Sequence, residues 1–304
     1  MDQTSPARRR FLATVFALAL CLAPFPNVNA QQQRLEKGQA PATGSPVSTL
    51  VTLGSSVITS AARLANYDPY ASFRGARYSN QGLLSERDEI RLGNQLHTEI
   101  SKKFRITSVG QQRAHRIGQL VARASLRPNL PYRFHLIAER EINAFATPGG
   151  HIYVTTALMN LANDEELASV LSHEVGHVVA RHSLKTLQHS RTLGGIADLF
   201  GSITGLAGDT AKELGTAAAQ IVASGLLAVH NREEEREADF LGVRGMPKAG
   251  LNPEAMITMF QKIQRVSKTN PGLLGSLFSD HPDVQERIDN TRYEIDRMRS
   301  ARQN

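Results

Sequence analysis

The clearest pattern of apolar and polar positions lies at residues 164–188, a stretch without proline. Apolar residues recur in it at steps of three and four, which is the period of one helix face. Asn163 stands where an N-cap is favoured, and the acidic residues after it suit the positive end of a helix dipole. The pattern predicts a long helix whose buried side carries Leu167, Val170, Leu171, Glu174, His177 and Val178.

Shorter periodic segments flank this helix. The predicted elements are helices at 85–104 and 111–125, strands at 132–139 and 151–156, a helix from Asn252 and a last helix from Val284. The strand segments are rich in aromatic and β-branched residues, and Pro148-Gly149-Gly150 separates extended stretches. We therefore expect an α+β fold that is mainly helical, with a small β-sheet beside the long helix.

The N-terminal residues have the character of a targeting segment. Arg8-Arg9-Arg10 precede an apolar run at 11–23 that is too short to span a bilayer, and Val28-Asn29-Ala30 resembles a signal-peptidase site. We expect cleavage after Ala30 and export of the protein to the periplasm. The arginines fit both an ordinary and a twin-arginine signal, and they do not decide between them.

The chain divides on this basis into a signal peptide at 1–30, a linker and partly disordered N-terminal segment at 31–84, and a domain at 85–304. Cys21 is the only cysteine and follows a leucine, a poor residue before a lipidated cysteine, so a lipid anchor there is the less favoured alternative. If Cys21 leaves with the signal, the exported chain has no thiol, which suits an oxidising compartment.

Charge adds little to this picture. Without residues 1–30 the chain has 32 basic and 27 acidic residues, a balance of +5. That balance is compatible with peripheral association with an anionic membrane surface. Aromatic residues do not alternate with basic ones as on a nucleic-acid surface, so we expect no nucleic-acid partner. Charges interrupt the Gly/Ala-rich segment 193–229, which argues against a membrane span and leaves plain helix packing or a lid as alternatives.

Candidate chemistry lies within the long helix, at His173-Glu174-Val175-Gly176-His177. Two histidines four residues apart point the same way from a helix and can bind one Zn²⁺, with Glu174 beside the metal as a general base. A glycine in a helix interior, such as Gly176, lowers the stability of the helix by about 1 kcal/mol relative to alanine. We therefore expect another backbone to pass close to the helix there.

A catalytic zinc needs a third protein ligand. Ala180 and Ser183 occupy the positions where a longer histidine motif would have its glycine and its third histidine. No glutamate occurs at 190–208, and the next acidic cluster is at 233–239. Spacing alone does not choose between Glu234 and Glu235, and a solvated helix face explains the cluster about equally well.

Four ordered motifs resemble the HtpX and CaaX-prenyl-protease family of zinc metallopeptidases, and most closely its periplasmic LoiP/BepA-like branch, which is related to the OMA-type proteases. They are Ile142-Asn143-Ala144-Phe145-Ala146 with Pro148 to Val154, the His173 to His177 motif, Glu235-Arg236-Glu237-Ala238-Asp239, and His281-Pro282 followed by Arg287-Ile288. The resemblance covers about residues 85–297. It implies a zincin-like metallopeptidase domain with one Zn²⁺ per chain.

The resemblance also implies roles for individual residues. His173, His177 and Glu235 would bind the zinc, Glu174 would be the catalytic base, and Asp239 would orient a ligand or donate a proton. His281 would line the pocket or start the last helix, which we favour over an approach to the metal. His182 follows His177 by five residues, off the ligand face, so we expect a packing or surface residue.

These expectations combine into an exported zinc endopeptidase that cleaves unfolded or misassembled envelope proteins, outer-membrane proteins among them. An extended substrate could pair with the edge of a strand beside the zinc helix. The alternative is a metal-binding periplasmic chaperone or assembly factor with little proteolysis. A membrane-embedded prenyl-protein protease is disfavoured, because we expect no spanning helix beyond the signal.

Overall fold

The computed structural model describes residues 67–78, 84–189, 210–274 and 284–303. Contacts divide the chain into two compact units, Met1–Ala71 and Ser72–Asn304, and only residues 67–71 of the first unit are described. The expected signal peptide, most of the linker and His281 lie outside the described residues. The expected domain limits therefore stay predictions.

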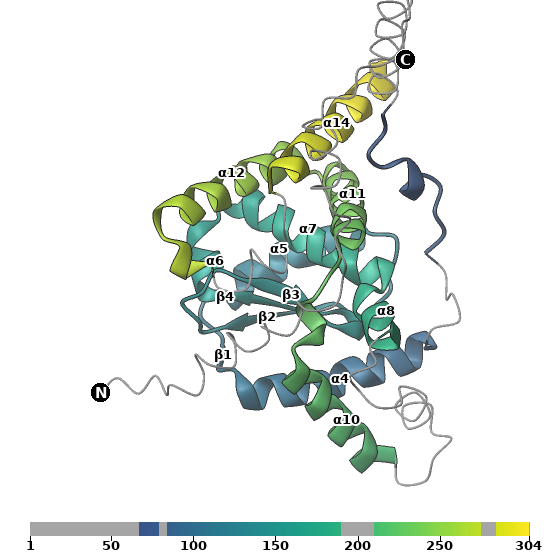
Figure 1. The fold of residues 1–304 in the computed structure, drawn as a ribbon, viewed down its shortest axis with the longest axis vertical. Coiled ribbons are helices and arrows are strands. Elements are labelled where there is room, and N and C mark those ends of the chain that lie inside the picture. The colour runs from purple at the N-terminus through teal and green to yellow at the C-terminus, as the bar shows by residue number, and fades with distance from the viewer. Residues whose placement is uncertain (1–66, 79–83, 190–209, 275–283, 304) are drawn as a thin grey trace, which may run out of the picture. The chain divides into compact units, whose positions relative to one another are not determined.

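The described part is mainly helical with one small sheet (Figure 1), which confirms the expected α+β class. The helices are α4 (Glu86–Lys103), α5 (Gln111–Arg123), α6 (Thr156–Leu161), α7 (Asp164–Ala180), α8 (His182–His189), α10 (Thr210–Ser224), α11 (Arg232–Lys248), α12 (Glu254–Thr269) and α14 (Val284–Gln303). Short 3-10 turns are η1 (Ala71–Phe73), η2 (Pro148–Gly150), η4 (Leu226–Ala228) and η5 (Pro271–Leu273). None of the described helices combines the length and apolar character that crossing a bilayer requires.

Four strands form one mixed sheet in the order β1-β2-β4-β3. They are β1 (Ile106–Thr107), β2 (Arg133–Ile137), β3 (Ala144–Ala146) and β4 (His151–Thr155). The central pair β2 and β4 is parallel, and the two outer strands are antiparallel to their neighbours. The two predicted strands are present as β2 and β4, whereas β1 and β3 are too short to show an alternating pattern.

Different helices cover the two faces of the sheet (Figure 1). Phe134 and Ile152 pack with α5 and α7 on one face, while Ile137 and Tyr153 pack with α4 and α10 on the other. This division follows from the alternation of side chains along β2 and β4. Part of the segment considered as a lid is thus the helix α10, which packs against α4; residues 193–209 lie outside the described part.

The long predicted helix begins where expected and ends earlier. Asn163 forms a capping box with Glu166, which confirms the predicted N-cap. The predicted run to residue 188 is wrong, because α7 ends at Ala180 and Arg181 takes a left-handed conformation with φ 58° before α8 begins. The Arg181 guanidinium lies 3.0 Å from the buried carboxylate of Glu89 on α4. Such a long-range ion pair leaves no trace in a periodic pattern.

α11 crosses α7 at very short range. A Cβ atom on Gly176 would lie 2.8 Å from the carbonyl oxygen of Ala238, so a side chain there would push the two helices apart. The close approach confirms the expectation that another backbone passes the long helix at Gly176. It also brings the acidic residues of α11 next to the two histidines of α7.

Candidate metal centre and active site

The two histidines of α7 bring their side chains together as their spacing predicts. The Nε2 atoms of His173 and His177 lie 3.0 Å apart, and both rings are buried. The rings meet edge to face, with their centroids 4.6 Å apart. Two Nε2 atoms therefore face one small volume between α7 and α11.

The Nδ1 atom of His173 is held by a carboxylate. It donates a hydrogen bond of 2.9 Å to Oδ1 of Asp239, one turn after Glu235 on α11. With the proton on Nδ1, the Nε2 lone pair of His173 is available to a metal. Burial raises the pKa of Asp239, but the Arg287 guanidinium outweighs it and holds that pKa below its usual value. The carboxylate therefore stays charged.

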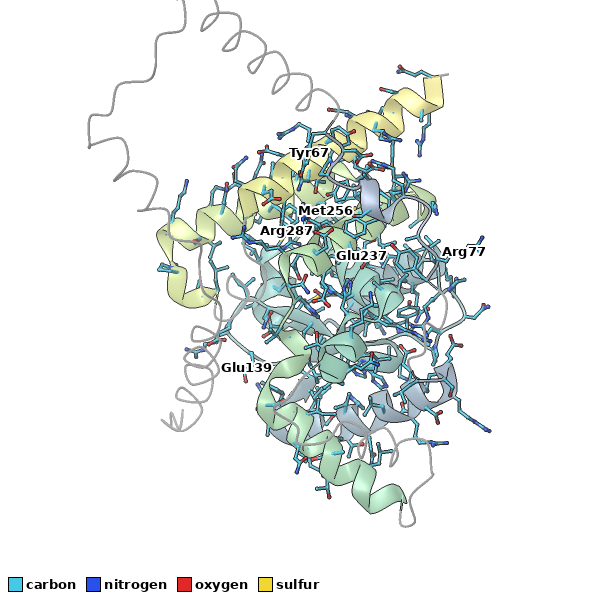
Figure 2. All side chains as sticks on the ribbon, turned by 45° about the vertical axis from the view of Figure 1, so that its right-hand side comes forward. Tyr67, Arg77, Glu139, Glu237, Met256 and Arg287 are labelled. Carbon is cyan, nitrogen blue, oxygen red and sulfur yellow. The ribbon has the colours of Figure 1, made fainter. Side chains whose placement is uncertain are left out.

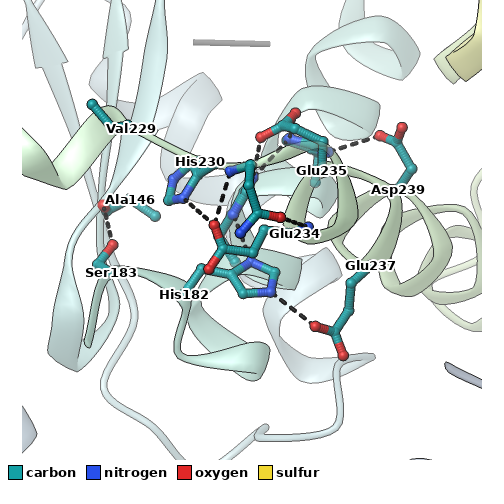
Figure 3. A network of polar contacts seen from close by, with 12 residues as sticks. Ala146, His182, Ser183, Val229, His230, Glu234, Glu235, Glu237 and Asp239 are labelled. Carbon is teal, nitrogen blue, oxygen red and sulfur yellow. Dashed lines mark hydrogen bonds and ion pairs between the residues drawn. The ribbon is translucent and has the colours of Figure 1, made fainter. Parts of the chain in front are cut away.

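The Nδ1 atom of His177 is held by a relay of two residues, His182 and Glu237. Nε2–H of His182 donates to Glu237 at 2.9 Å (Figure 3). This leaves Nδ1 of His182 as the acceptor for Nδ1–H of His177 at 2.8 Å. His182 is fully buried and is no member of the candidate metal groups, so of the two expected roles the structure shows packing. The break at Arg181 turns the chain so that His182 lies beside His177. His230 stacks on the same imidazole at 4.0 Å between centroids.

The structure places the two candidate glutamates of α11 in different surroundings. The side chain of Glu234 accepts from the backbone of Asn231 at 3.0 Å and forms the capping box of the helix. Glu235, one residue on, faces α7, with Oε1 3.2 Å from Nε2 of His177 and Oε2 3.4 Å from Nε2 of His173. Glu235 is only 2% exposed. Its carboxylate therefore shares the volume between the helices with both imidazoles.

This donor set fits a zinc ion. One ligand atom from each of His173, His177 and Glu235 lies within 4.8 Å of the others. Ligands at zinc distances in a tetrahedron lie about 3.3 to 3.6 Å from one another. The contacts of 3.0, 3.2 and 3.4 Å are close to these values, so small outward movements would admit an ion. Two imidazoles and one carboxylate are the set found at many catalytic zinc sites.

The charges around the site favour a cation. Burial lowers the pKa of His173, yet the carboxylates of Glu235 and Asp239 more than compensate and raise that pKa to about 9. The potential at this imidazole is thus negative enough to hold an added positive charge, which a metal ion could supply in place of the proton. Burial, together with His230, lowers the pKa of His177 well below its usual value and keeps the ring neutral.

Arg287 reaches the site from α14. It donates to both carboxylate oxygens of Asp239, at 2.7 and 2.8 Å, and its Nη1 lies 3.1 Å from Oε2 of Glu235. The guanidinium also lies 4.5 Å from the ring centroid of Phe260 on α12. One buried cation therefore connects the last helix to Glu235 and Asp239 of α11.

A cleft opens beside His173 and Glu174. It encloses about 520 Å³, including space open to solvent. Its walls come from β3, α7, α12 and α14, and the lining residues are Ala144, Ser169, Val170, His173, Glu174, Met256, Met259, Phe260, Ile263, Val284 and Arg287. Met256 and Arg287 are labelled in Figure 2. The lining is largely apolar, and its polar residues are Ser169, His173 and Glu174 of α7 and Arg287 of α14.

A family comparison agrees with the site. Residues 108–295 match the model of peptidase family M48, and the match includes both helices of the site. The chain belongs to peptidase family M48. This confirms the resemblance drawn from the four motifs, and it makes the chain a member of a metalloprotease family. The expected position of His281 falls outside the described residues, so its role stays a prediction.

Individual relatives show the same relationship. The metalloprotease LoiP of Escherichia coli is 28% identical over 71% of this chain and 82% of its own, and the metalloprotease YcaL of the same organism is 26% identical over 70% and 82%. A putative beta-barrel assembly-enhancing protease of Vibrio cholerae is 34% identical over 53% of this chain. That match spans only 34% of the Vibrio relative's own length.

The roles of several residues of the site could not be predicted from the sequence. His182, Glu237 and His230 hold or stack on His177 through contacts that depend on the break at Arg181 and on the approach of α11. Arg287 belonged to a recognised motif, but its contact with Asp239 joins residues 48 positions apart. The sequence signal that could have found them is limited to the presence of polar residues at otherwise buried helix positions.

Proposed function

We propose that this chain is a zinc-dependent endopeptidase. The observation that supports the proposal most directly is the convergence of His173, His177 and Glu235 on one buried volume, with Glu174 of the same helix beside an apolar cleft. A zinc ion held there would polarise a peptide carbonyl and make water a better nucleophile at neutral pH. Membership of a metalloprotease family fits this chemistry.

The remaining roles follow from position. Glu174 lines the cleft next to His173, so its carboxylate can take a proton from the attacking water and return it to the leaving amine. Asp239 and the His182–Glu237 pair hold the Nδ1 atoms of the two imidazoles and leave both Nε2 atoms to the metal. Arg287 keeps Asp239 charged and fixes α14 over the site.

The cleft favours substrates that present apolar side chains. Met259, Ile263 and Val170 form apolar walls at the site, which suits a side chain that a folded protein would bury. Ala144 belongs to β3, the outer strand of the described sheet, and lines the same cleft. An extended peptide paired with β3 would pass Glu174. We therefore place unfolded or misassembled proteins as the substrate class.

We place these substrates in the bacterial envelope. The arginines and apolar run of residues 1–30 support export to the periplasm, with cleavage near Ala30. One group of relatives carries the name beta-barrel assembly-enhancing protease, which supports outer-membrane proteins as natural substrates. N-terminal sequencing of the protein from the periplasmic fraction tests this, with Gln31 as the expected first residue.

The central test separates metal binding from hydrolysis. Glu174→Gln should keep about one zinc per chain and lose cleavage of unfolded casein by at least two orders of magnitude, because the base is gone while the ligands remain. Glu99→Gln is the matched control and should cleave casein as the unaltered protein does, because this partly exposed glutamate of α4 pairs with Lys102 on its own helix and is no part of the candidate site. Undiminished cleavage by Glu174→Gln would refute the catalytic assignment. Absence of cleavage by the unaltered zinc-loaded chain would favour the chaperone alternative.

A further inference from the structure

A second cluster of imidazoles lies on the opposite face of the sheet from α7. His97 projects from α4, His135 from β2 and His151 from β4, and one ring nitrogen of each lies within 4.8 Å of the others. His135 and His151 alternate with Phe134 and Ile152, which pack towards α7, so they point the other way. The sheet therefore separates this cluster from the site between α7 and α11.

The hydrogen bonds around the cluster prepare His151 as a metal ligand. Nε2–H of His151 donates to the side-chain oxygen of Asn94 at 3.1 Å, and this oxygen also accepts from Arg133 at 2.8 Å. The tautomer fixed in this way leaves the Nδ1 lone pair of His151 facing His135. Nδ1 of His151 and Nε2 of His135 lie 3.0 Å apart, close to the edge of a zinc tetrahedron.

His97 has an equivalent anchor. Its Nδ1 lies 3.0 Å from the hydroxyl of the buried Tyr153, which pairs with His135 across β2 and β4. A proton donated from Nδ1 to this oxygen leaves Nε2 of His97 for a metal. The three rings are nearly parallel, with 10° between His135 and His151 and 22° between His97 and His135. Joint ligation requires one ring to turn about χ2, a soft torsion for histidine.

The imidazoles are already in the state that a metal needs. Burial, the neighbouring histidines and Arg133 lower the pKa of His135 to about 4 and that of His151 to about 3. Burial and Arg133 also lower the pKa of His97. At neutral pH the rings are uncharged, so a metal does not have to displace a proton from an imidazolium.

We propose that His97, His135 and His151 form a second metal site that takes a borderline divalent transition ion such as Zn²⁺. The candidate group in this part of the described structure contains imidazoles and no carboxylate, which disfavours Mg²⁺ and Ca²⁺. The ion would join α4 to β2 and β4 on the face of the sheet away from the HExxH helix. Its role would be structural, since no general base accompanies it in the group.

Metal stoichiometry tests the proposal on the full chain. After incubation with excess ZnCl₂ and desalting, the unaltered protein should retain two zinc ions, and His135→Gln should retain one. His135→Gln should keep full cleavage of unfolded casein and an unchanged melting temperature in chelator, because the catalytic residues lie across the sheet. His115→Gln, an exposed histidine on α5, is the matched control and should retain two ions.

A complementary variant identifies where the ions bind. In Glu235→Gln, which weakens the site between α7 and α11, added zinc should still raise the melting temperature, and the further change His135→Gln should remove that rise. A single zinc in the unaltered protein that His135→Gln leaves in place would overturn the second site. So would a zinc-induced rise that survives His135→Gln in the Glu235→Gln chain. Casein cleavage by His135→Gln is read separately, so failure of the second site leaves the proposed protease function intact.

Discussion

For the two imidazoles of α7, the hydrogen-bond partner of Nδ1 decides which ring nitrogen is free to bind a metal. Asp239 fixes His173 directly, whereas His177 depends on His182, which depends in turn on Glu237. A metal-binding histidine held by a neutral imidazole is less basic than one held by a carboxylate. The two ligands are therefore unequal, and His182 is the point at which the weaker one can be tested.

His182→Leu should lower the affinity for zinc by about 10- to 100-fold, because His177 loses the acceptor that sets its tautomer. His182→Gln, whose amide oxygen can accept the same hydrogen bond, should recover part of this loss. Competition with a chromophoric chelator measures the affinity, and circular dichroism checks the fold. Equal zinc affinity in His182→Leu and the unaltered protein would show that the relay has no influence on the metal.

Arg287 and a bound metal should each be able to replace part of the other's stabilising charge. Both neutralise the buried carboxylates of Glu235 and Asp239. Removing one partner of a buried ion pair costs about 3–5 kcal/mol, so Arg287→Met should be strongly destabilised without metal. Zinc should then raise its melting temperature by more than it raises that of the unaltered protein. Arg292→Met, an exposed arginine on the same helix, should show the unaltered response. Equal zinc-induced shifts of the melting temperature in all three proteins would contradict the idea that Arg287 and the metal neutralise the same carboxylates.

The proposed ligands could be predicted from the sequence, but the residues that hydrogen-bond to them could not. The four-residue spacing on a helix brings His173 and His177 together in any fold that keeps the helix. Glu235 became the proposed third ligand only through resemblance, because its distance from α7 depends on how α11 packs. The group of His97, His135 and His151 joins one helix and two strands, and no local spacing relates its members.

At the scale of elements, the approach of α7 to α11 controls whether the site can form. Gly176→Ala places a Cβ 2.8 Å from a backbone oxygen, which cannot move without the helix. We expect a loss of about 1–3 kcal/mol in the free energy of unfolding and weaker zinc binding. Gly245→Ala on α11 is a matched control, because its nearest neighbour is the Ser172 hydroxyl at 3.4 Å. It should be neutral or stabilising, since alanine favours a helix. Urea denaturation distinguishes the two, and equal stabilities would refute this account of the crossing.

The periodic pattern of apolar residues predicted some boundaries of the helices and strands and missed others. It predicted the start of α7, because Asn163 and Glu166 form a local capping box. It missed the end, because Arg181 takes a left-handed conformation that no periodic pattern signals, and its guanidinium pairs with Glu89, which is far away in sequence. It also missed β3, whose three residues are too few for an alternating pattern. Local interactions were therefore predictable, and elements defined by long-range contacts were not.

The cleft wall contributed by α7 offers a test of substrate choice. Val170 is only partly buried and lines the cleft one turn before Glu174. Val170→Lys should lower kcat/KM for unfolded casein about tenfold or more, because a charge in the cleft disfavours apolar side chains, while zinc content stays unchanged. Val170→Ile keeps the apolar wall and should retain most of the activity. Full activity in Val170→Lys would exclude this part of the cleft from substrate binding.

At the scale of the whole molecule, the sheet carries different chemistry on its two faces. One face supports α7, whose metal site faces α11 and the cleft, and the other holds the His97, His135 and His151 group under α4. Two apolar clusters lie on these faces, and neither includes a residue of either metal site. The core should therefore remain folded without metal, unlike a small zinc finger.

Removal of metal should consequently abolish activity before it abolishes structure. With chelator present we expect no casein cleavage, a helical circular dichroism spectrum and a cooperative thermal transition. In the His135→Gln chain, where only the site between α7 and α11 would bind zinc, returning zinc at about 100 times its dissociation constant should add about 2.7 kcal/mol, which raises the melting temperature on the order of 5–10 °C, and should restore cleavage. In that variant the ligands come from α7 and α11 alone, so the stabilisation reports on the packing of these helices rather than on the core. A chelated protein that is already unfolded would show that the apolar clusters are insufficient, and cleavage that persists in chelator would remove the metal from the mechanism.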